Sequence, residues 1–290
     1  MAFHRNANPY IGQVHLYVSE LERSLSFYQS VLGFTVLYEK ADSVTLTADD
    51  RHALVTLEER KDAHPKQSRR TGLFHFAILL PTRKDLGNFL MHIQKLNVPL
   101  QGRSDHLFSE ALYLSDPDGH GIEVYCDRPS TEWKWNGDEL PLVSDPIDVE
   151  GILAISDGKW EHLPPETVIG HIHLHVRDLE EAKSFYVDGL GFEVTIPIRH
   201  QALFVASGGY HHHIGLNTWN GQGAEPPDAN TIRLHSYTIV FSHDKERTEA
   251  LQRIEEKGFK VHKDESGIWA TDPSANRIQF VLESDSSSNS

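Results

Sequence analysis

Histidines are the most prominent reactive side chains of this sequence, since 19 of its 290 residues are histidine. An imidazole can bind a metal ion or transfer a proton near neutral pH. Three histidines alternate with apolar residues at 171–176, and three more are consecutive at 211–213. Glu123 lies in the apolar segment GIEVY, where a buried carboxylate would be costly without a counter-charge such as a metal ion. Any one of these histidines alone is more often a hydrogen-bonded residue of a sheet, so the chemistry depends on which side chains come together.

Composition and charge restrict the chemistry further. Cys126 is the only cysteine, which excludes an intrachain disulfide and a thiolate-built zinc or iron–sulfur site. The net charge of -15, from 27 Lys+Arg against 42 Asp+Glu, argues against a nucleic-acid or anionic-membrane surface. Residues 1–13 contain no apolar core of a secretory signal, and no apolar run approaches the ~18 residues of a membrane span. We therefore expect a cytoplasmic protein with a small-molecule partner.

The elements that would position these side chains belong to an internal duplication. Residues 11–34 and 169–192 are identical at 13 of 24 positions. Two further pairs of segments are similar, 72–98 with 233–259 and 115–125 with 271–281. Such repetition along both halves predicts a chain built from repeated modules.

Each module is predicted to be a βαβββ unit. The alternation of histidines and apolar residues at 171–176 has the period of a strand. The segment 179–192 places apolar residues on one helical face, and its Gly191 suits a helix end. Short strands follow each helix. These units define module one at about 10–58, module two at about 72–127, module three at about 169–217 and module four at about 233–283. The expected fold class is α+β.

The modules predict two domains of two modules each. The first domain is expected at 1–128, with modules one and two, and the second at 169–283, with modules three and four. Residues 129–168 connect them and, at about 40 residues, exceed the length of a usual loop. The serine-rich tail 284–290 is expected to be disordered.

Two motifs carry a resemblance to a known family. SFYxxxLGF follows the first strand of modules one and three, and DPDGxGIE leads to Glu123 in module two. Together with the four modules, these motifs resemble the vicinal oxygen chelate superfamily over nearly the whole chain. Its members include glyoxalase I, fosfomycin-resistance thiol transferases, bleomycin-binding proteins and type I extradiol dioxygenases, so the fold alone does not choose a function.

The resemblance implies a set of metal ligands. Family members carry ligands at an inward position of a module's first strand and near the end of its last strand. The aligned positions are Gln13, His75, His171 and Ser236 on first strands, and Glu123 and Gln279 on the last strands of modules two and four. Only His75, Glu123 and His171 form a 2-His-1-carboxylate set, the facial triad of non-haem Fe(II) oxygen chemistry. The same ligands also suit Mn(II), or Zn(II) in a hydrolytic site.

A narrower signature resembles that of the extradiol dioxygenases. It starts at His106, continues through an aliphatic–Tyr pair ending at Tyr113 and an acid–Pro–x–Gly segment, and ends at Glu123. Ser104 departs from the pattern, which favours Gly, Asn, Thr, Ile or Val at that position. The resemblance implies that His106 and Tyr113 hydrogen-bond the substrate oxygen and assist proton transfer.

A further acid–base residue follows from the same resemblance. The segment YHHHIGLN is similar to the strand that supplies the family's second acid–base histidine, and the alignment places this residue at His212. Because alternate residues of a strand face opposite sides, His211 and His213 are expected to be structural. A shift of one residue in the register would exchange these roles.

The likeness extends to bacterial catechol-2,3-dioxygenases and related hydroquinone-cleaving enzymes. The implied reaction inserts both atoms of O2 into a catechol-type or hydroquinone-type ring at Fe(II), with Mn(II) as the alternative metal, and gives a ring-opened semialdehyde. The implied partners are a small aromatic diol and O2, as in aromatic compound catabolism, and the family is compatible with a homo-oligomer.

The ligand positions depart from the usual two-domain extradiol pattern, in which modules three and four supply the metal site. Here module four has Ser236 and Gln279 at its two ligand positions. A hydroxyl and a neutral amide are poor ligands for divalent iron, so module four lacks a usable set. The three good ligands are split between modules two and three. We therefore predict a metal site shared between the two halves of the sequence.

Two other functions use the same scaffold. A glyoxalase-type lyase or isomerase holds Zn, Ni or Mn with four protein ligands, two of them glutamates; the second acidic candidate here is Glu58, at the end of module one. A non-catalytic binding protein of the bleomycin-resistance kind would not need the ligand triad together with His106, Tyr113 and His212. Uptake of O2 on addition of a catechol distinguishes the dioxygenase from both.

Overall fold

A computed structural model describes residues 3–4, 8–198 and 200–286 and contains the four predicted βαβββ units. Module one comprises β1 (Tyr10–Val18), α1 (Leu21–Ser30), β2 (Thr35–Glu39), β3 (Ser43–Thr47) and β4 (Val55–Glu59). Module two comprises β5 (Gly72–Leu79), α2 (Arg83–Lys95), β6 (Gly102–Asp105), β7 (Ser109–Ser115) and β8 (Gly121–Asp127). Module three comprises β9 (Val168–His175), α4 (Leu179–Lys183) with the π-helical turn η2 (Ser184–Gly189), β10 (Glu193–Ile198), β11 (Ala202–Ala206) and β12 (Ile214–Asn217). Module four comprises β13 (Leu234–Phe241), α5 (Asp244–Glu256), β14 (Val261–Asp264), β15 (Gly267–Thr271) and β16 (Arg277–Leu282).

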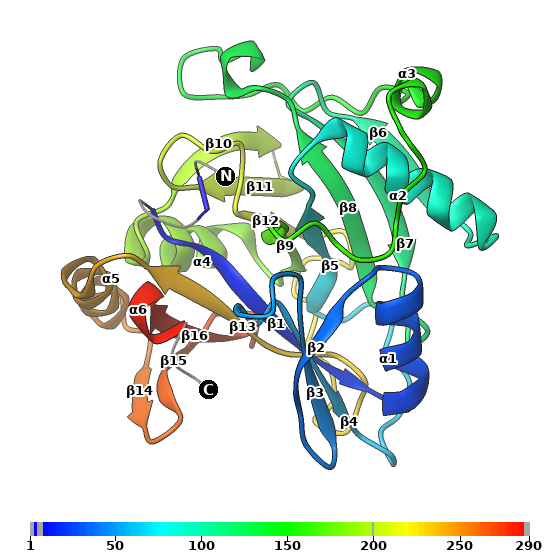
Figure 1. Ribbon diagram of the computed structural model, residues 1–290. Coiled ribbons are helices and arrows are strands. Elements are labelled where there is room, and N and C mark those ends of the chain that lie inside the picture. Colours follow the sequence, from blue (N-terminus) through cyan, green and yellow to red (C-terminus); the bar gives the residue numbers. More distant parts are fainter. Residues whose placement is uncertain (1–2, 5–7, 199, 287–290) are drawn as a thin grey trace.

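The strands form two eight-stranded sheets that each draw on both halves of the sequence (Figure 1). One sheet has the order β14-β15-β16-β13-β1-β4-β3-β2, and the other has the order β10-β11-β12-β9-β5-β8-β7-β6. Within each module the first strand pairs in parallel with the last strand. The first strands of two modules then pair antiparallel, β1 with β13 and β5 with β9. The α+β class is confirmed. One sheet is built from modules one and four, and the other from modules two and three.

This pairing corrects the expected grouping of modules. The predicted ranges 1–128 and 169–283 are the two halves of the sequence. Each sheet combines strands from both, so neither range forms a complete sheet by itself. The physical reason is that the first strand lies at one edge of its own module. Its unpaired backbone N–H and C=O groups there need a strand from another module. In both sheets that partner comes from the other half, which also brings modules two and three together.

The core follows from the strand alternation. One cluster of buried apolar side chains includes residues of all four modules, for example Leu16, Phe76, Ile172 and Ile239. Because neighbouring residues of a strand face opposite sides, the residues between these core positions lie on the other face of their sheet. In β5, β8 and β9 that other face carries the histidines and Glu123.

The segment between the two halves is ordered, and part of it lies against module two. It contains the short helix η1 (Ser130–Glu132) and α3 (Val149–Ala154), and α3 lies beside α2 (Figure 1). An isolated bridge joins Asp105 to Asp145. The expectation of a disordered tail from 284 is wrong for its first residues, since Glu283–Ser286 form the helical turn α6. Residues 287–290 lie outside the described part of the chain.

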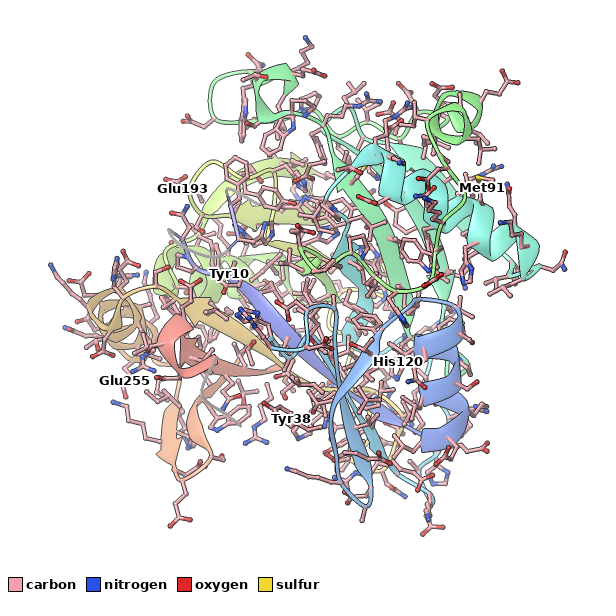
Figure 2. All side chains as sticks on the ribbon, in the orientation of Figure 1. Tyr10, Tyr38, Met91, His120, Glu193 and Glu255 are labelled. Atoms are coloured by element: carbon pink, nitrogen blue, oxygen red, sulfur yellow. The ribbon has the colours of Figure 1, made fainter. Side chains whose placement is uncertain are left out.

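The two sheets are joined by polar contacts between modules one and two. His120, labelled in Figure 2, is fully buried in the turn before β8, and its Nε2 lies 2.9 Å from the backbone oxygen of Tyr17. Asp118 accepts hydrogen bonds from the Ser19 hydroxyl and from Arg23, both at 2.6 Å. These contacts fix the loop that leads into β8. Among the described residues, no helix combines the length and apolar character needed to cross a membrane.

Candidate metal centre

Three adjacent strands bring the predicted ligands to one point. In the order β9-β5-β8, Ala77 of β5 lies opposite both His171 and Glu123, and its small side chain leaves room between them. His75 lies two residues earlier on the same face of β5. At Gly121, a Cβ would overlap the backbone oxygen of Phe74, so glycine permits the close approach of β8 to β5 beside His75.

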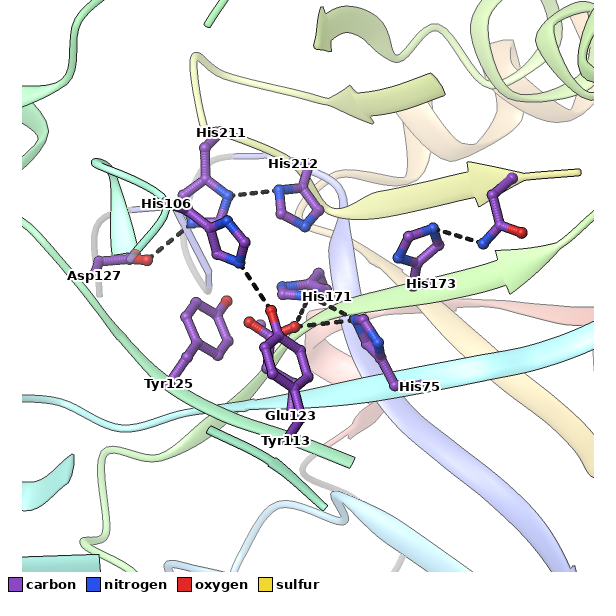
Figure 3. Close-up of polar contacts among 12 residues, drawn as sticks. His75, His106, Tyr113, Glu123, Tyr125, Asp127, His171, His173, His211 and His212 are labelled. Carbon is purple, nitrogen blue, oxygen red and sulfur yellow. Dashed lines mark hydrogen bonds and ion pairs between the residues drawn. The ribbon is translucent and has the colours of Figure 1, made fainter. Parts of the chain in front are cut away.

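The three ligand side chains converge closely (Figure 3). Oε2 of Glu123 lies 3.0 Å from Nε2 of His75 and 3.1 Å from Nε2 of His171. The two Nε2 atoms are 3.4 Å apart, and all three side chains are buried. Two imidazoles and one carboxylate that direct their donor atoms at each other are the arrangement expected of ligands to one divalent ion.

The electrostatics of these residues fit a cation. Burial alone would raise the pKa of Glu123, but His171 and His75 outweigh it and hold this pKa well below its ordinary value. Burial lowers the pKa of His171 to about 4, against the opposing effect of Glu123. A carboxylate and a neutral imidazole are the protonation states that a metal ion requires of its ligands.

His106 and Tyr113 lie beside the ligand set. Tyr113 pairs with Glu123 across β7 and β8, and its hydroxyl lies 2.8 Å from Nε2 of His106. Nδ1 of His106 lies 2.5 Å from the backbone oxygen of Val143, which can only accept, so Nδ1 carries the hydrogen. Nε2 of the neutral ring then accepts from the Tyr113 hydroxyl. Burial and the neighbouring Glu123 raise the pKa of Tyr113 well above its ordinary value, which keeps the phenol protonated.

His212 also faces the ligands, although the histidine triplet does not lie on a strand. β12 begins at Ile214, and the triplet forms a bend before it. The ring of His212 lies 4.1 Å from that of His171 between centroids and lines the same cavity. His211 turns to Asp127, and His213 turns to the backbone of Phe3. His212 therefore faces the cavity while His211 and His213 turn to other partners, as expected, but this arrangement arises from a bend and not from a strand.

A cavity of about 430 Å³ opens onto these residues. Its walls include the side chains of Phe74, Leu142, His173, Phe204 and Trp219, none of which the sequence analysis assigned to the site. The alternation in β9 would have identified His173, because it lies two residues after His171 on the same face. The other four come from separate elements and carry no shared local signal.

The corresponding positions of the other sheet hold no ligand set. Gln13 donates to the Thr56 hydroxyl at 2.7 Å, and Gln279 donates to the backbone oxygen of Ser266 at 2.8 Å. Glu58 also lies in that sheet, where it is 2.8 Å from Arg60 and 3.0 Å from His15. Glu58 is therefore not a fourth ligand beside His75, as a glyoxalase-type site would require.

Similarity to known proteins covers both halves of the chain. The sequence pattern of the Glyoxalase/Bleomycin resistance protein/Dioxygenase superfamily matches residues 10–124 and 168–280. The chain is 44% identical over 278 residues to the catechol-2,3-dioxygenase of Bacillus subtilis (strain 168), covering 94% of this chain and 97% of that protein. It is 29% identical over 125 residues to biphenyl-2,3-diol 1,2-dioxygenase 3 of Rhodococcus globerulus, covering 42% of this chain and 66% of that protein. The structure of glyoxalase I from Zea mays matches with a TM-score of 0.60 at 15% identity, covering 96% of this chain and 93% of that one, and shows the same fold.

Proposed function

Because the chain belongs to the Glyoxalase/Bleomycin resistance protein/Dioxygenase superfamily, we propose that it is an extradiol dioxygenase that cleaves a catechol-type ring at non-haem Fe(II). The observation that carries this proposal is that the buried side chains of His75, Glu123 and His171 converge in the wall of a cavity. Mn(II) fits the same donor set. The product of the reaction is a ring-opened semialdehyde.

The metal would be held by His75, Glu123 and His171. When bound, it would act as a Lewis acid that lowers the pKa of the diol hydroxyl and would supply the redox chemistry of O2. The protein residues contribute the remaining chemistry. His212 would accept the hydroxyl proton, because burial and His171 lower the pKa of His212 well below its ordinary value and so keep its ring neutral, with one nitrogen free to accept.

Tyr113 and His106 would orient the substrate as a pair. In the free protein the Tyr113 hydroxyl is protonated and donates to Nε2 of His106. On substrate binding it would turn this hydrogen to a diol oxygen and pass a proton during ring opening. The carbonyl of Val143 keeps His106 in one tautomer. This pair would therefore act together, and truncation of either residue should disturb the same proton transfer.

The cavity favours a neutral aromatic diol. Phe74, Leu142 and Phe204 provide apolar walls for a ring, and no Lys or Arg stands among the described residues that line the cavity. A substrate carboxylate would find no cationic partner there and would lie close to the negative Glu123. We therefore propose catechol and its uncharged derivatives as substrates.

Oxygen uptake tests the proposed function directly. Protein loaded anaerobically with Fe(II) is expected to consume one O2 per catechol and to produce the absorbance of a semialdehyde. Metal-free and Zn(II)-loaded protein serve as controls and should consume none. If the Fe(II)-loaded protein turns over no catechol while it retains stoichiometric metal, the proposed activity is wrong.

His212→Ala is expected to separate catalysis from binding. Loss of an acid–base group should lower kcat by ~10²–10⁴-fold, while bound metal and the KM for catechol stay close to wild type. His243→Ala, which removes an exposed histidine between β13 and α5 that does not line the cavity, is the matched control and should keep full activity. Steady-state kinetics measure kcat and KM, and metal analysis measures the bound metal, in both variants. Wild-type kcat in His212→Ala would remove His212 from the reaction.

A further inference from the structure

A chain of buried hydrogen bonds leads away from the metal centre through His212. Nδ1 of His212 lies 2.8 Å from Nδ1 of His211, and Nε2 of His211 lies 2.9 Å from Oδ1 of Asp127 (Figure 3). The His211 side chain is 0% exposed and that of Asp127 is 22% exposed. His211 was expected to be structural, and no role was expected for Asp127.

We propose that Asp127 and His211 are positioning residues that set the tautomer and the orientation of His212. This inference rests on the proposed function, in which His212 accepts a proton from the substrate. It adds two residues that do not touch the substrate and act through His212.

The hydrogen-bond directions follow from Asp127, the acceptor at the end of the hydrogen-bonded chain. An ionised carboxylate can only accept, so Nε2 of His211 carries a hydrogen and donates to Asp127. In a neutral His211, Nδ1 is then an acceptor and must receive its hydrogen from Nδ1 of His212. This leaves Nε2 of His212 as the unprotonated nitrogen. The chain thus prepares the base in the form that the reaction needs, by the same logic that orients a histidine in a catalytic triad.

Packing holds the middle of the chain in place. The ring of His211 is stacked on Phe108, with centroids 4.5 Å apart, and its centroid lies 4.0 Å from that of Tyr210. The Tyr210 hydroxyl lies 3.3 Å from Asp127 and 2.7 Å from the Tyr125 hydroxyl. A ring enclosed in this way cannot turn to another partner without disturbing its neighbours, so the hydrogen bond to His212 is rigid.

The carboxylate at the end of this hydrogen-bonded chain comes from the strand that also supplies the ligand Glu123. Asp127 lies four residues after Glu123 in β8 and therefore on the same face of the sheet.

The tautomer can be measured without any metal or turnover. In metal-free protein labelled with ¹⁵N-histidine, His212, assigned with the His212→Gln variant, is expected to show hydrogen on Nδ1 and none on Nε2. His211→Phe keeps an aromatic ring between Phe108 and Tyr210 but removes the acceptor. In that variant His212 should carry its hydrogen on Nε2, the tautomer that free histidine prefers. Wild-type protein with hydrogen on Nε2 of His212 would overturn the proposal.

Kinetics of the Fe(II)-loaded enzyme test the consequence for the reaction. Asp127→Asn should lower kcat by about 10–100-fold, as observed for residues that orient another functional group, with unchanged KM and metal content. Asp127→Glu retains the charge and should recover a large part of that loss. Asp138→Asn, an exposed substitution in the connecting segment that follows β8, should have wild-type kcat.

The outcomes separate this inference from the proposed function. Wild-type kcat in both Asp127→Asn and His211→Phe would overturn the positioning role and leave ring cleavage intact. Equal losses in Asp127→Asn and Asp127→Glu, with a fall in melting temperature and metal content, would make Asp127 a structural residue and overturn the role as well. A wild-type enzyme that cleaves no catechol would overturn the proposed function, and the tautomer of His212 would still decide whether the hydrogen-bonded chain exists.

Discussion

Glu123→Ala is expected to abolish ring cleavage and to leave protein that binds little Fe(II). Glu123 is the only carboxylate of the ligand set and lies within 3.1 Å of both imidazoles, so its loss removes the charge and the geometry of the site together. The fold should persist, because the neighbouring core residues Ile122 and Val124 are unchanged. Metal analysis after anaerobic loading, circular dichroism and O2 uptake measure these three properties.

The internal repeat provides a matched control for this prediction. Gln279 occupies in module four the position that Glu123 occupies in module two, and it already donates to Ser266. Gln279→Ala should therefore keep wild-type metal content and activity. The prediction is wrong if Glu123→Ala still binds stoichiometric iron. It is also wrong if Gln279→Ala loses as much iron as Glu123→Ala, because the metal would then not distinguish the two sheets.

His171→Ala is expected to have an equally large effect, because the second imidazole comes from the other half of the sequence. The distance of 3.4 Å between its Nε2 and that of His75 arises from the antiparallel pairing of β5 with β9. Without His171, the site has one imidazole and one carboxylate, which should not hold Fe(II) at stoichiometry. The measurement is again iron per chain together with O2 uptake.

The repeat also offers a control for His171. Gln13 holds the equivalent position in module one and donates to Thr56 in the other sheet. Gln13→Ala should bind a full equivalent of Fe(II), even if the lost hydrogen bond lowers its melting temperature slightly. Unchanged iron in His171→Ala would show that the metal is not shared between modules two and three.

Much of the fold could be predicted from the sequence. The duplication is visible as 13 identities in 24 positions, and the alternation of residues 171–176 has the period of a strand, so the four βαβββ units and the face occupied by His171 followed directly. Family motifs then assigned His75 and Glu123. These inferences succeed because side-chain alternation and helix periodicity are local properties of the backbone, readable over a few residues.

The arrangement of the modules could not be read in this way. Alternation shows which face of a strand a residue occupies but not which strand lies beside it. His75 and His171 are 96 residues apart in sequence and meet only because β5 and β9 pair across the two halves. The residue types favoured this pairing, because modules one and four lack ligands. The tertiary structure established it.

The chemical types at the site could be predicted from the residues and motifs: two imidazoles and a carboxylate on the inner faces of strands, with a histidine triplet nearby. The hydrogen bonds among those histidines depend on how distant segments pack together. His211 became a partner of His212 and Asp127 through a bend before β12 that no periodic pattern encodes. His106 acquired its tautomer from Val143, in a connecting segment that passes over the cavity. Hydrogen-bond partners depend on distances of a few tenths of an ångström between distant segments, and packing of the whole chain sets those distances.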